Sequence, residues 1–437
     1  MRPTGRLHIG HYFGALQNWV RLQNDPSYDC CYFIADWHAL TSDYADTSAV
    51  AQNTIEIVTD YLAAGLDPQE SVIFQQSLVP EHAELHLLLG MVTPLSWLER
   101  VPTYNEAFEN VTNKDLHTYG FLGYPCLQTA DIVMYSEPGV PLFVPVGEDQ
   151  ASHVELSREI VRRFNHYFGL QIDPQLFQLK YRRFLQDVLN SEAVGWPQDQ
   201  ETAQALEKWF RYPEQSPTQY FDLARFDPTG KTKTEMWIKG RARKAGVGNF
   251  LEDMQQFLTT SLDYAGFFSF TDLQEPNVLL TNTPRIPGLD GRKMSKSYGN
   301  AITLSESDDD IRKKTKVMVT DPARKRRNDP GNPDVCPVYD WHKLFSPKLV
   351  LDWAAEGCRT AGIGCIECKA KMADHLIEWI TPIRERRIEY EKHPARVLEV
   401  IDEGSKKARE VAKGTLERVR EAVFGWQKKR KEVVSNQ

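Results

Sequence analysis

Apolar residues in the first part of the chain follow two alternating spacing patterns. In residues 10–23 and again in 47–64 they recur at helical spacing, and glycine or proline follows each stretch. Residues 31–35 and 72–75 are short apolar runs between polar neighbours, which is typical of strands buried on both faces. Helices and strands that alternate in this way predict an α/β domain with a Rossmann-like parallel sheet.

The rest of the chain divides into three further parts by the same criteria. Helical periodicity dominates residues 305–437, which predicts an all-α C-terminal domain. Residues 170–271 are rich in aromatic residues, too apolar for a disordered linker and long enough for a small inserted domain. We therefore predict that the α/β domain comes in two pieces, 1–169 and 272–304, with the insertion between them.

Composition limits the class of protein. The 437 residues are 41% apolar and 26% charged, which describes a soluble globular protein. No run of about 18 apolar residues predicts a membrane span, and the N-terminus lacks the pattern of a signal peptide, which favours the cytoplasm. The net charge of −8 excludes general attraction to nucleic acid, so RNA contacts would have to come from local basic patches.

The stretch 287–300 contains the most specific pattern in the chain. Gly288 and Gly291 predict a turn, and Lys293 and Lys296 follow with serines beside them. Two ammonium groups and two hydroxyls on a loop suit a polyphosphate whose charge shifts during a reaction. A solvated basic loop would explain a bare Lys-x-x-Lys, but the full order Lys-Met-Ser-Lys-Ser is far rarer.

A second candidate site lies near the N-terminus, in residues 3–11. His8 and His11 share one face if this segment opens a helix. Gly10 removes a side chain where a nucleotide would approach closely. A His-x-Gly-His pattern alone also suits a metal half-site, surface histidines or a small adenylyltransferase. Combined with the loop at 293–297, it indicates nucleotide chemistry.

Together the two motifs resemble the paired signature sequences of class I aminoacyl-tRNA synthetases. The resemblance implies catalytic residues that stabilise charge on ATP–Mg²⁺ as an amino-acid carboxylate attacks the α-phosphate: His8, His11, Lys293 and Lys296. It also implies ATP contacts from Arg2, Pro3, Thr4, Gly10, His11, Gly147, Glu148, Asp149, Ile286, Lys293, Met294, Ser295, Lys296 and Ser297. In that family a strand precedes the first motif, so we expect the native start to lie upstream of Met1.

Residues 124–135 indicate which amino acid is used. A helix here places Gln128 and Ile132 on one face, and Asp131 stands among small and apolar neighbours. A buried carboxylate needs a donor, either within the fold or on a ligand. The segment resembles the specificity helix of tryptophanyl-tRNA synthetases, which implies that Asp131 accepts the indole N–H. The implied tryptophan pocket consists of Asp131, Tyr124, Gln128, Ile132, His38, Val144, Val146 and Gln150.

Basic residues occur in clusters within two parts of the chain. In the insertion, 231–244 is basic with a tryptophan inside it, which is compatible with RNA binding but favours a solvated helix face. The C-terminal helices resemble a domain that holds the tRNA anticodon. Phosphate partners there would come from Arg384, Arg386, Arg387, Lys406, Lys407 and Arg409.

Seven cysteines in a cytosolic chain argue against a disulfide framework and for metal binding or free thiols. Cys336, Cys358, Cys365 and Cys368 form the pattern C-x21-C-x6-C-x2-C, whose last pair can meet one metal centre. All-cysteine ligation suits a [4Fe–4S] cluster or a structural Zn²⁺, and the spacing leaves both open beside unmetallated thiols. The pattern resembles the iron–sulfur motif of some tryptophanyl-tRNA synthetases, whose first spacing is one residue longer.

By motif order the chain resembles bacterial-type tryptophanyl-tRNA synthetases over about 1–169 and 272–425. This implies a homodimeric tryptophan–tRNA ligase whose partners are ATP–Mg²⁺, L-tryptophan and tRNA(Trp). A tyrosyl-tRNA synthetase is an alternative with the same fold. A catalytically silent paralogue that binds RNA or regulates is an alternative of another class, and the intact His8, His11, Lys293 and Lys296 argue against it.

Overall fold

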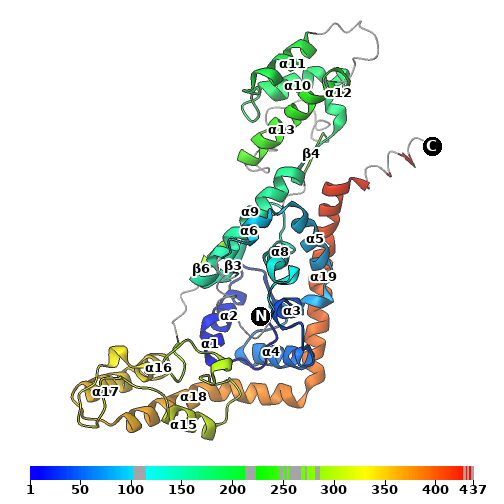
Figure 1. The fold of residues 1–437 in the computed structure, drawn as a ribbon. Helices are drawn as coiled ribbons and strands as arrows, with labels where there is room; N and C mark the ends of the chain where they lie inside the picture. The colour runs from blue at the N-terminus through cyan, green and yellow to red at the C-terminus, as the bar shows by residue number, and fades with distance from the viewer. Residues whose placement is uncertain are drawn as a thin grey trace.

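The protein, seen here as a computed structural model, forms three connected regions (Figure 1). A central region contains the parallel strands, a helical region lies at one end of it, and a smaller group of helices lies at the other end. The structure describes residues 1–101, 104, 115–211, 223–245, 250, 253–254, 267–270, 273–280, 286–426, 430 and 433–434.

Two parallel pairs of strands form the centre of the fold. β1 (Cys30–Ile34) pairs with β2 (Ser71–Gln75), and β3 (Leu142–Val146) pairs with β6 (Pro276–Leu280). The predicted α/β class with a Rossmann-like parallel sheet is confirmed. Within the described residues the two pairs remain separate sheets, and both β1 and β3 line a cavity of about 470 Å³.

The helix α4 (Val50–Ala64) shows how sequence builds the connection between β1 and β2. Its buried residues include Ile57, Val58 and Tyr61, which belong to the main hydrophobic core. Gly65 follows in the left-handed region at φ 112°, a conformation that favours glycine and ends the helix. The helix predicted over 47–64 therefore ends where expected and begins a few residues later.

The other helices of the central region surround these strands. The helix predicted over 10–23 is present but contains a π-helical turn, so that α1 (Ile9–His11), η1 (Tyr12–Leu16) and α2 (Gln17–Gln23) follow one another. The remaining elements are α3 (Asp36–Asp43), η2 (Gln76–Leu78), α5 (Glu81–Val92), α6 (Leu95–Leu98), α8 (Tyr119–Val133) and α9 (Glu148–Phe168).

Residues after α9 form the smaller group of helices, which has a hydrophobic core of its own. β4 (Leu170–Ile172) pairs antiparallel with β5 (Phe268–Phe270) where the chain enters and leaves the group. The buried residues Leu185, Trp209 and Ile238 belong to a cluster separate from the central core. The principal helices are α10 (Arg182–Asn190), α11 (Gln200–Phe210), α12 (Leu223–Phe226) and α13 (Pro228–Ala245).

The basic stretch 231–244 lies on α13, and three of its lysines form ion pairs within the group. Lys231 and Lys239 both contact Glu235, at 3.1 and 2.9 Å. Lys233 contacts Glu201 of α11. Because these charges are compensated locally, the arrangement agrees with a solvated helix face and gives no support to an RNA site on α13.

The C-terminal region is helical as predicted. Ser307 accepts the backbone N–H of Asp310 and caps the first of these helices, α15 (Asp308–Lys316). α16 (Pro337–Phe345) and α17 (Lys348–Arg359) follow. α18 (Cys365–Lys392) continues through Pro382 as one helix, and α19 (Pro394–Phe424) follows it.

α19 runs back along the central region and packs closely against β2 (Figure 1). A Cβ atom at Gly404 would lie 1.8 Å from the carbonyl oxygen of Ile73, so only glycine allows the two backbones to approach this closely. The next residue, Ser405, accepts the N–H of Gln75 through its hydroxyl at 3.3 Å. The C-terminal helix therefore completes the central core.

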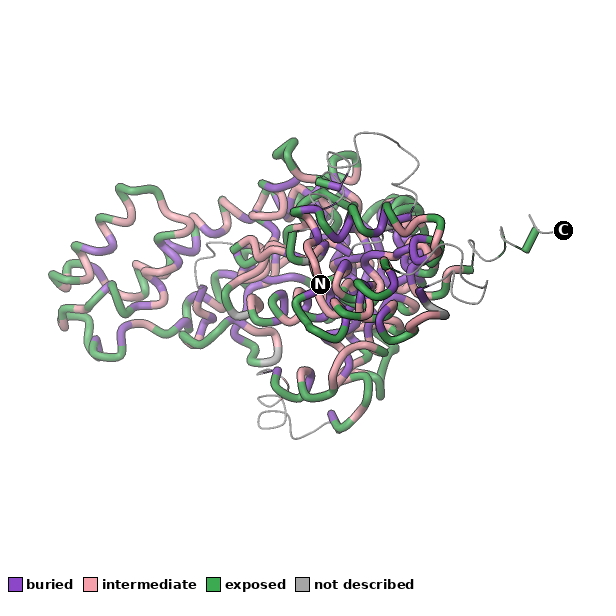
Figure 2. Tube along the Cα trace, turned by 90° about the horizontal axis from the view of Figure 1, so that it is seen from above, coloured by how far each residue is buried: buried purple, intermediate pink, exposed green. Residues whose placement is uncertain are grey.

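Buried residues gather in the middle of the molecule, whereas buried and exposed residues alternate in the helices at one end (Figure 2). The main core joins both ends of the chain, because Leu7 and Ile9 share it with Leu376 and Ile401. Among the described residues, no helix has the length and apolar character needed to cross a membrane.

The Gly404→Ala substitution should lower the free energy of unfolding by about 3 kcal/mol, because the added methyl group collides with the backbone of β2. Gly414→Ala is the matched control, since it lies on the same helix and a Cβ atom there would have no atom within 4 Å. It should raise stability by up to about 1 kcal/mol through helix propensity. Denaturant unfolding measures the free energy of unfolding of both variants. Equal changes in that free energy would contradict the close packing of Gly404 against β2.

Candidate active site

The two sequence motifs meet through backbone pairing. The N–H of Ile9 donates to the carbonyl of Ile302 at 3.0 Å, and the N–H of Leu304 donates to the carbonyl of Leu7 at 2.9 Å. The segment containing His8 is therefore bound directly to the residues that follow the Lys-Met-Ser-Lys-Ser loop. Two stretches almost 300 residues apart in the sequence form one site.

Asn300 organises the signature loop from its C-terminal end. Its side-chain oxygen accepts the N–H of Ser295 at 2.7 Å, and its amide donates to Asp290 at 2.7 Å and to the carbonyl of Lys293 at 3.1 Å. A Cβ atom at Gly288 would lie 2.4 Å from this amide, which explains the glycine. The sequence analysis missed Asn300; its place directly after the motif was the available signal.

Lys296 joins the loop to the N-terminal motif. Its ammonium group donates to the carbonyl oxygens of Thr4 at 2.6 Å and Arg6 at 3.0 Å. Burial lowers the pKa of this lysine. Met294 is buried next to Gly10, whereas Lys293 is exposed. The structure thus brings Lys296 into the N-terminal site and leaves Lys293 at its edge.

His8 and His11 lie with their rings stacked, 3.6 Å apart between centroids. Burial, together with the nearby positive charge on Lys296, lowers the pKa of His8 to about 4. Burial, the neighbouring His8 and Lys296 lower the pKa of His11 to about 3. Both rings are therefore neutral at pH 7. The backbone N–H of His8 donates to Nδ1 of His11 at 3.2 Å, so the proton of the neutral His11 ring is on Nε2, where it can act as a donor.

Some of the remaining predicted ATP contacts have partners within the fold. Arg2 donates to the hydroxyl of Ser42, and the carbonyl of Pro3 accepts the side-chain amide of Asn53 at 3.1 Å. Gly147 precedes α9, whose first residue, Glu148, is exposed. The contacts above define no role for three further predicted residues. Ile286 is buried, and the side chains of Asp149 and Ser297 lie outside the described residues.

Asp131, the predicted indole acceptor, is buried and has partners within the fold. One carboxylate oxygen contacts Nδ1 of His82 at 2.5 Å, and the other contacts Nε2 of His38 at 2.7 Å. The amide of Gln76 donates to both oxygens, at 2.7 and 2.8 Å. Burial alone would raise the pKa of Asp131, but the two histidines hold it at about 2. The carboxylate is therefore charged.

Gln76 and His82 are residues that the sequence analysis missed. Gln76 directly follows β2 and also accepts the N–H of Trp37 at 3.1 Å. His82 contacts the hydroxyl of Tyr135 at 2.6 Å through its second nitrogen. Ligand-contacting residues commonly follow the carboxyl ends of parallel strands, so the position of Gln76 was the available signal.

The other predicted pocket residues lie on α8, on β3 and at the start of α9. Tyr124 contacts Nε2 of His153 through its hydroxyl at 2.8 Å. Val144 lines the cavity shared by β1 and β3. Those that are half-buried and near the surface are Gln128, Ile132, Val144, Val146 and Gln150. The structure thus places Asp131, His38 and Tyr124 in polar networks and Val144 in the wall of the cavity.

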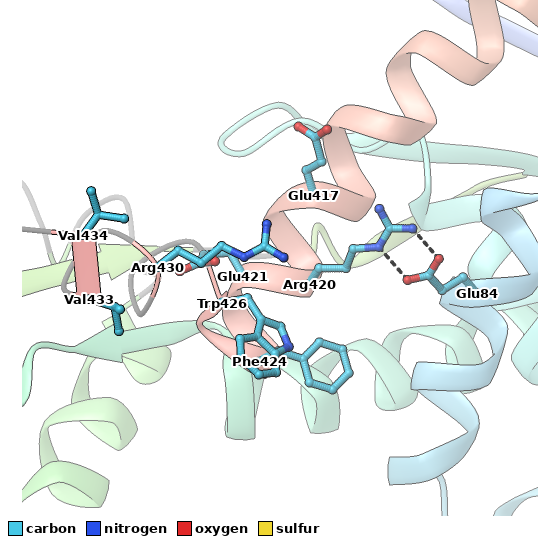
Figure 3. A pocket seen from close by; sticks show the side chains of 9 residues that line it. All are labelled: Glu84, Glu417, Arg420, Glu421, Phe424, Trp426, Arg430, Val433 and Val434. Atoms are coloured by element: carbon cyan, nitrogen blue, oxygen red, sulfur yellow. Dashed lines mark hydrogen bonds and ion pairs between the residues drawn. The ribbon is translucent and has the colours of Figure 1, made fainter.

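A larger hollow of about 880 Å³ lies at the end of α19, away from both motifs (Figure 3). Its arginine Arg420 forms a bidentate pair with Glu84 at 2.6 and 2.5 Å. Carboxylates outnumber guanidinium groups along its wall, which does not suit the phosphates of ATP or RNA. The lining residues are Glu84, Glu417, Arg420, Glu421, Phe424, Trp426, Arg430, Val433 and Val434.

The four cysteines of the predicted metal centre lie in the C-terminal helical region. Burial, together with the nearby thiols of the other three, raises the pKa of Cys368 to about 12. Cys358 accepts a long contact of 3.9 Å from Arg324, and Cys368 lies 3.5 Å from His342. Among the described residues, however, no three His, Cys, Asp or Glu side chains are arranged to hold a metal ion.

Comparison with known proteins identifies the family. The family of tRNA synthetases class I (W and Y) matches residues 1–188 and 252–380, so the chain belongs to this family. The tryptophan–tRNA ligase of Ralstonia nicotianae is 42% identical over 434 residues, with 97% of this chain and 96% of that protein covered. The enzyme of the same name from Thermotoga maritima is 40% identical over 424 residues, with 97% of each chain covered.

A solved structure supports the fold. The tryptophanyl-tRNA synthetase from Campylobacter jejuni, complexed with ADP and tryptophane, has a TM-score of 0.65 at 24% identity, covering 97% of this chain and 98% of that chain. The family match leaves residues 189–251 uncovered, a shorter stretch than the predicted insertion at 170–271. None of the comparisons shows that this segment is extra, so the insertion stays a prediction.

Acidification from pH 6.5 to pH 4 should lower the free energy of unfolding. In this window His11 stays neutral in the folded chain and His8 takes up a proton only as the pH approaches 4, whereas the unfolded chain protonates both near pH 6.5. The unfolded state therefore binds more protons, and each ring lowers stability by at most about 1.4 kcal/mol per pH unit. The free energy of unfolding, measured with urea across this range, should fall less steeply with pH in His8→Asn than in the wild type. An equal dependence on pH would contradict burial of a neutral ring.

Proposed function

We propose that the protein is a tryptophan–tRNA ligase, which activates L-tryptophan with ATP and transfers it to tRNA(Trp). The observation that supports this most strongly is the identity of 42% to such a ligase over nearly the whole of both chains. The geometry agrees, because Lys296 reaches the carbonyls of Thr4 and Arg6 and so unites the two motifs. The alternatives are a tyrosine-specific enzyme and a catalytically silent relative. The experiments below distinguish both from a tryptophan–tRNA ligase.

In the activation step, a carboxylate oxygen of tryptophan attacks the α-phosphorus of ATP–Mg²⁺. The bond from that phosphorus to its bridging oxygen breaks, and pyrophosphate leaves. No protein nucleophile is needed, so catalysis consists of positioning and of stabilising charge on the phosphates. We assign His8 and His11 the role of neutral hydrogen-bond donors, and Lys293 and Lys296 the role of cations that contact the leaving pyrophosphate.

In the transfer step, a hydroxyl of the 3′-terminal adenosine of tRNA attacks the carbonyl carbon of the adenylate, and AMP leaves. We propose that residues 305–437 bind the anticodon. Arg387 is not available for this purpose, because it is buried and paired with Asp60 and Glu56. The exposed Lys406 and Lys407 remain the better phosphate partners in this region.

We propose that the enzyme works as a cytoplasmic homodimer. An exposed apolar patch on α5, α6 and α8 supports the dimer: Leu87 and Met91 lie one turn apart, Leu95 follows, and the hydroxyl of Tyr119 comes within 3.7 Å of a Cβ placed at Gly90. Apolar side chains grouped on a surface in this way mark protein contacts. The mass of the protein in solution should correspond to two chains.

Exchange of labelled pyrophosphate into ATP, measured with each of the twenty amino acids in turn, tests the function. Only tryptophan should support exchange. Lys296→Ala should reduce its rate by roughly 10²–10³, because it removes a contact to developing charge. The matched control is Lys348→Ala on α17, whose exposed ammonium pairs with Asp352 far from both motifs and which should keep full activity. Exchange that is as fast in Lys296→Ala as in the control would refute the assignment.

We propose that Asp131 selects tryptophan by accepting its indole N–H. Because the carboxylate already has three partners, the ligand would have to share or replace one of them. His38 is the most suitable, since its side chain is 14% exposed whereas that of His82 is fully buried. A charged acceptor left unpaired by phenylalanine or tyrosine would reject these amino acids strongly.

Asp131→Asn should therefore reduce the selectivity for tryptophan over phenylalanine by at least about 100-fold, with little change in the KM for ATP. The asparagine keeps the size of the side chain and removes its charge. Steady-state exchange kinetics with both amino acids give the ratio. If Asp131→Asn is folded and keeps wild-type selectivity, Asp131 is only a structural partner of His82 and Gln76.

We propose that Cys336, Cys358, Cys365 and Cys368 hold a [4Fe–4S] cluster, with Zn²⁺ as the alternative. The all-thiol donor set and the mutual effect of these thiols on the pKa of Cys368 support it, and the arrangement of the described side chains does not. A cation would reverse the rise in pKa, since thiolates bind metals. The centre would be structural, because it lies in the helical region and not beside His8 or Lys296.

Protein purified without oxygen should be brown and contain about four irons per chain if a Cys₄ cluster is bound. Cys365→Ser should lose the colour and the iron, whereas Cys126→Ser, on α8, should keep both. One zinc per chain in colourless protein would indicate the alternative. Metal-free protein with four reactive thiols in this region would exclude both.

A further inference from the structure

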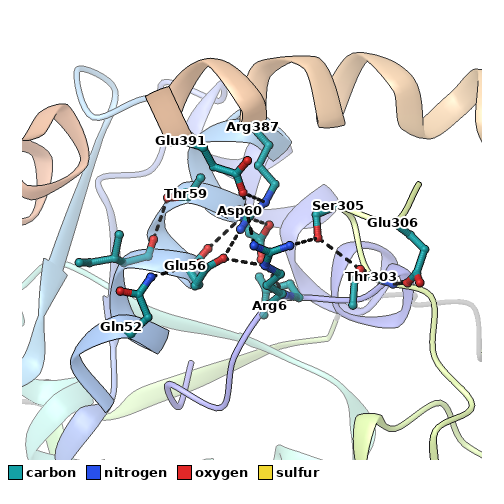
Figure 4. A network of polar contacts seen from close by, with 12 residues as sticks. Arg6, Gln52, Glu56, Thr59, Asp60, Thr303, Ser305, Glu306, Arg387 and Glu391 are labelled. Atoms are coloured by element: carbon teal, nitrogen blue, oxygen red, sulfur yellow. Dashed lines mark hydrogen bonds and ion pairs between the residues drawn. The ribbon is translucent and has the colours of Figure 1, made fainter. Parts of the chain in front are cut away.

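Arg387 of α18 is a buried arginine outside both sequence motifs (Figure 4). Its side chain is 1% exposed and forms ion pairs with three carboxylates. Nη1 lies 2.5 Å from Asp60, Nη2 contacts Glu56, and Nε lies 3.2 Å from Glu391. Asp60 and Glu56 belong to α4 of the central region, so Arg387 links the C-terminal helices to the α/β domain.

The two carboxylates on α4 extend this link to the N-terminal motif. The second oxygen of Asp60 accepts the backbone N–H of Leu7 at 2.6 Å, and Leu7 directly precedes His8. Glu56 accepts a hydrogen bond from Nε of Arg6 at 2.9 Å. Asp60 thus bonds to Arg387 and to Leu7, and Glu56 bonds to Arg387 and to Arg6.

Residues 6 and 7 are held from the opposite side by the signature loop and the segment after it. The carbonyl of Arg6 accepts the ammonium of Lys296 at 3.0 Å, and the carbonyl of Leu7 accepts the N–H of Leu304 at 2.9 Å. The guanidinium of Arg6 also donates to the hydroxyl of Ser305 at 3.2 Å. This short backbone segment is therefore fixed between α4 and the loop, and Arg387 holds the α4 side.

The buried charges explain why this arrangement depends on Arg387. Asp60 is fully buried, and a carboxylate in that environment is costly unless a cation and hydrogen-bond donors surround it. Without Arg387, Asp60 would take up a proton or turn towards water. The amide of Leu7 would then lose a charged acceptor, and the adjacent ring of His8 would move with its backbone.

We propose that Arg387 is a positioning residue for adenylate formation: through Asp60 and Glu56 it holds the backbone of Arg6 and Leu7, and thereby His8 and Lys296, in the geometry that binds ATP. This inference rests on the proposed function. Arg387 lies behind α4 and contacts no substrate. Its effect falls on the nucleotide side of the site, because none of its contacts reaches the network around Asp131.

Kinetics of tryptophan-dependent pyrophosphate exchange in Arg387→Lys test the proposal. Lysine keeps the charge but cannot bridge both carboxylates with a planar fork. The KM for ATP should rise, and kcat should fall, by about tenfold or more. The KM for tryptophan should stay within about twofold of the wild type. The matched control is Arg312→Lys on α15, whose exposed guanidinium pairs with Asp374 of α18 and not with Asp60 or Glu56.

A double variant, Asp60→Leu with Arg387→Met, separates positioning from stability. It removes both charges of the buried pair, so its thermal midpoint should recover towards that of the wild type if Arg387→Lys lowers it. The ATP KM should remain raised, because the ordered acceptor for Leu7 is not restored. Both variants are assayed well below their thermal midpoints. If Arg387→Lys does not fold, the ATP KM of the double variant alone tests the proposal.

Two results would overturn the inference. One is an Arg387→Lys variant with a lowered thermal midpoint but the same ATP KM as Arg312→Lys, which would make the pair purely structural. The other is a double variant that regains both stability and the wild-type ATP KM. A wild-type protein without tryptophan-dependent exchange would instead refute the proposed function, so the two failures are distinguishable.

Discussion

The buried carboxylate of Asp60 is the constraint on which the rest of the site depends. It lies in the main core, where an unpaired negative charge would be costly, and it is satisfied by Leu7 and Arg387. These partners come from the start of the chain and from α18, more than 300 residues apart. The electrostatic requirement of a single side chain therefore fixes how the helical region docks on the α/β domain.

Burial also determines the charges of the groups around the nucleotide site. His8 and His11 are neutral, and Lys296 has a lowered pKa because water is partly excluded from it. The ammonium of Lys296 donates to two backbone carbonyls, those of Thr4 and Arg6. A phosphate would compete with these carbonyls for the same donor, so the loop must rearrange if Lys296 is to follow the leaving pyrophosphate.

Asp131 and the four cysteines illustrate two different uses of buried polar groups. The hydrogen bonds around Asp131 leave its carboxylate charged and fully bonded, as expected of an ordered network inside a protein. The thiols raise the pKa of Cys368 and have only weak contacts with Arg324 and His342. The first arrangement is complete as it stands, whereas the thiols form a ligand set only under the metal centre proposed above.

The sequence by itself determined the class of fold and the two motifs, because apolar periodicity and short ordered patterns are local properties. It also located the end of α4 at Gly65, since the left-handed conformation there is a local requirement. Partners distant in sequence were decided by tertiary structure: Asn300 for the loop, Gln76 and His82 for Asp131, and Arg387 for Asp60. From sequence alone, an arginine on a helix is expected at the surface. Only the fold shows which carboxylate it pairs with. The close contact of Gly404 with β2 has the same origin, because only the path of α19 across the sheet demands a residue without a side chain.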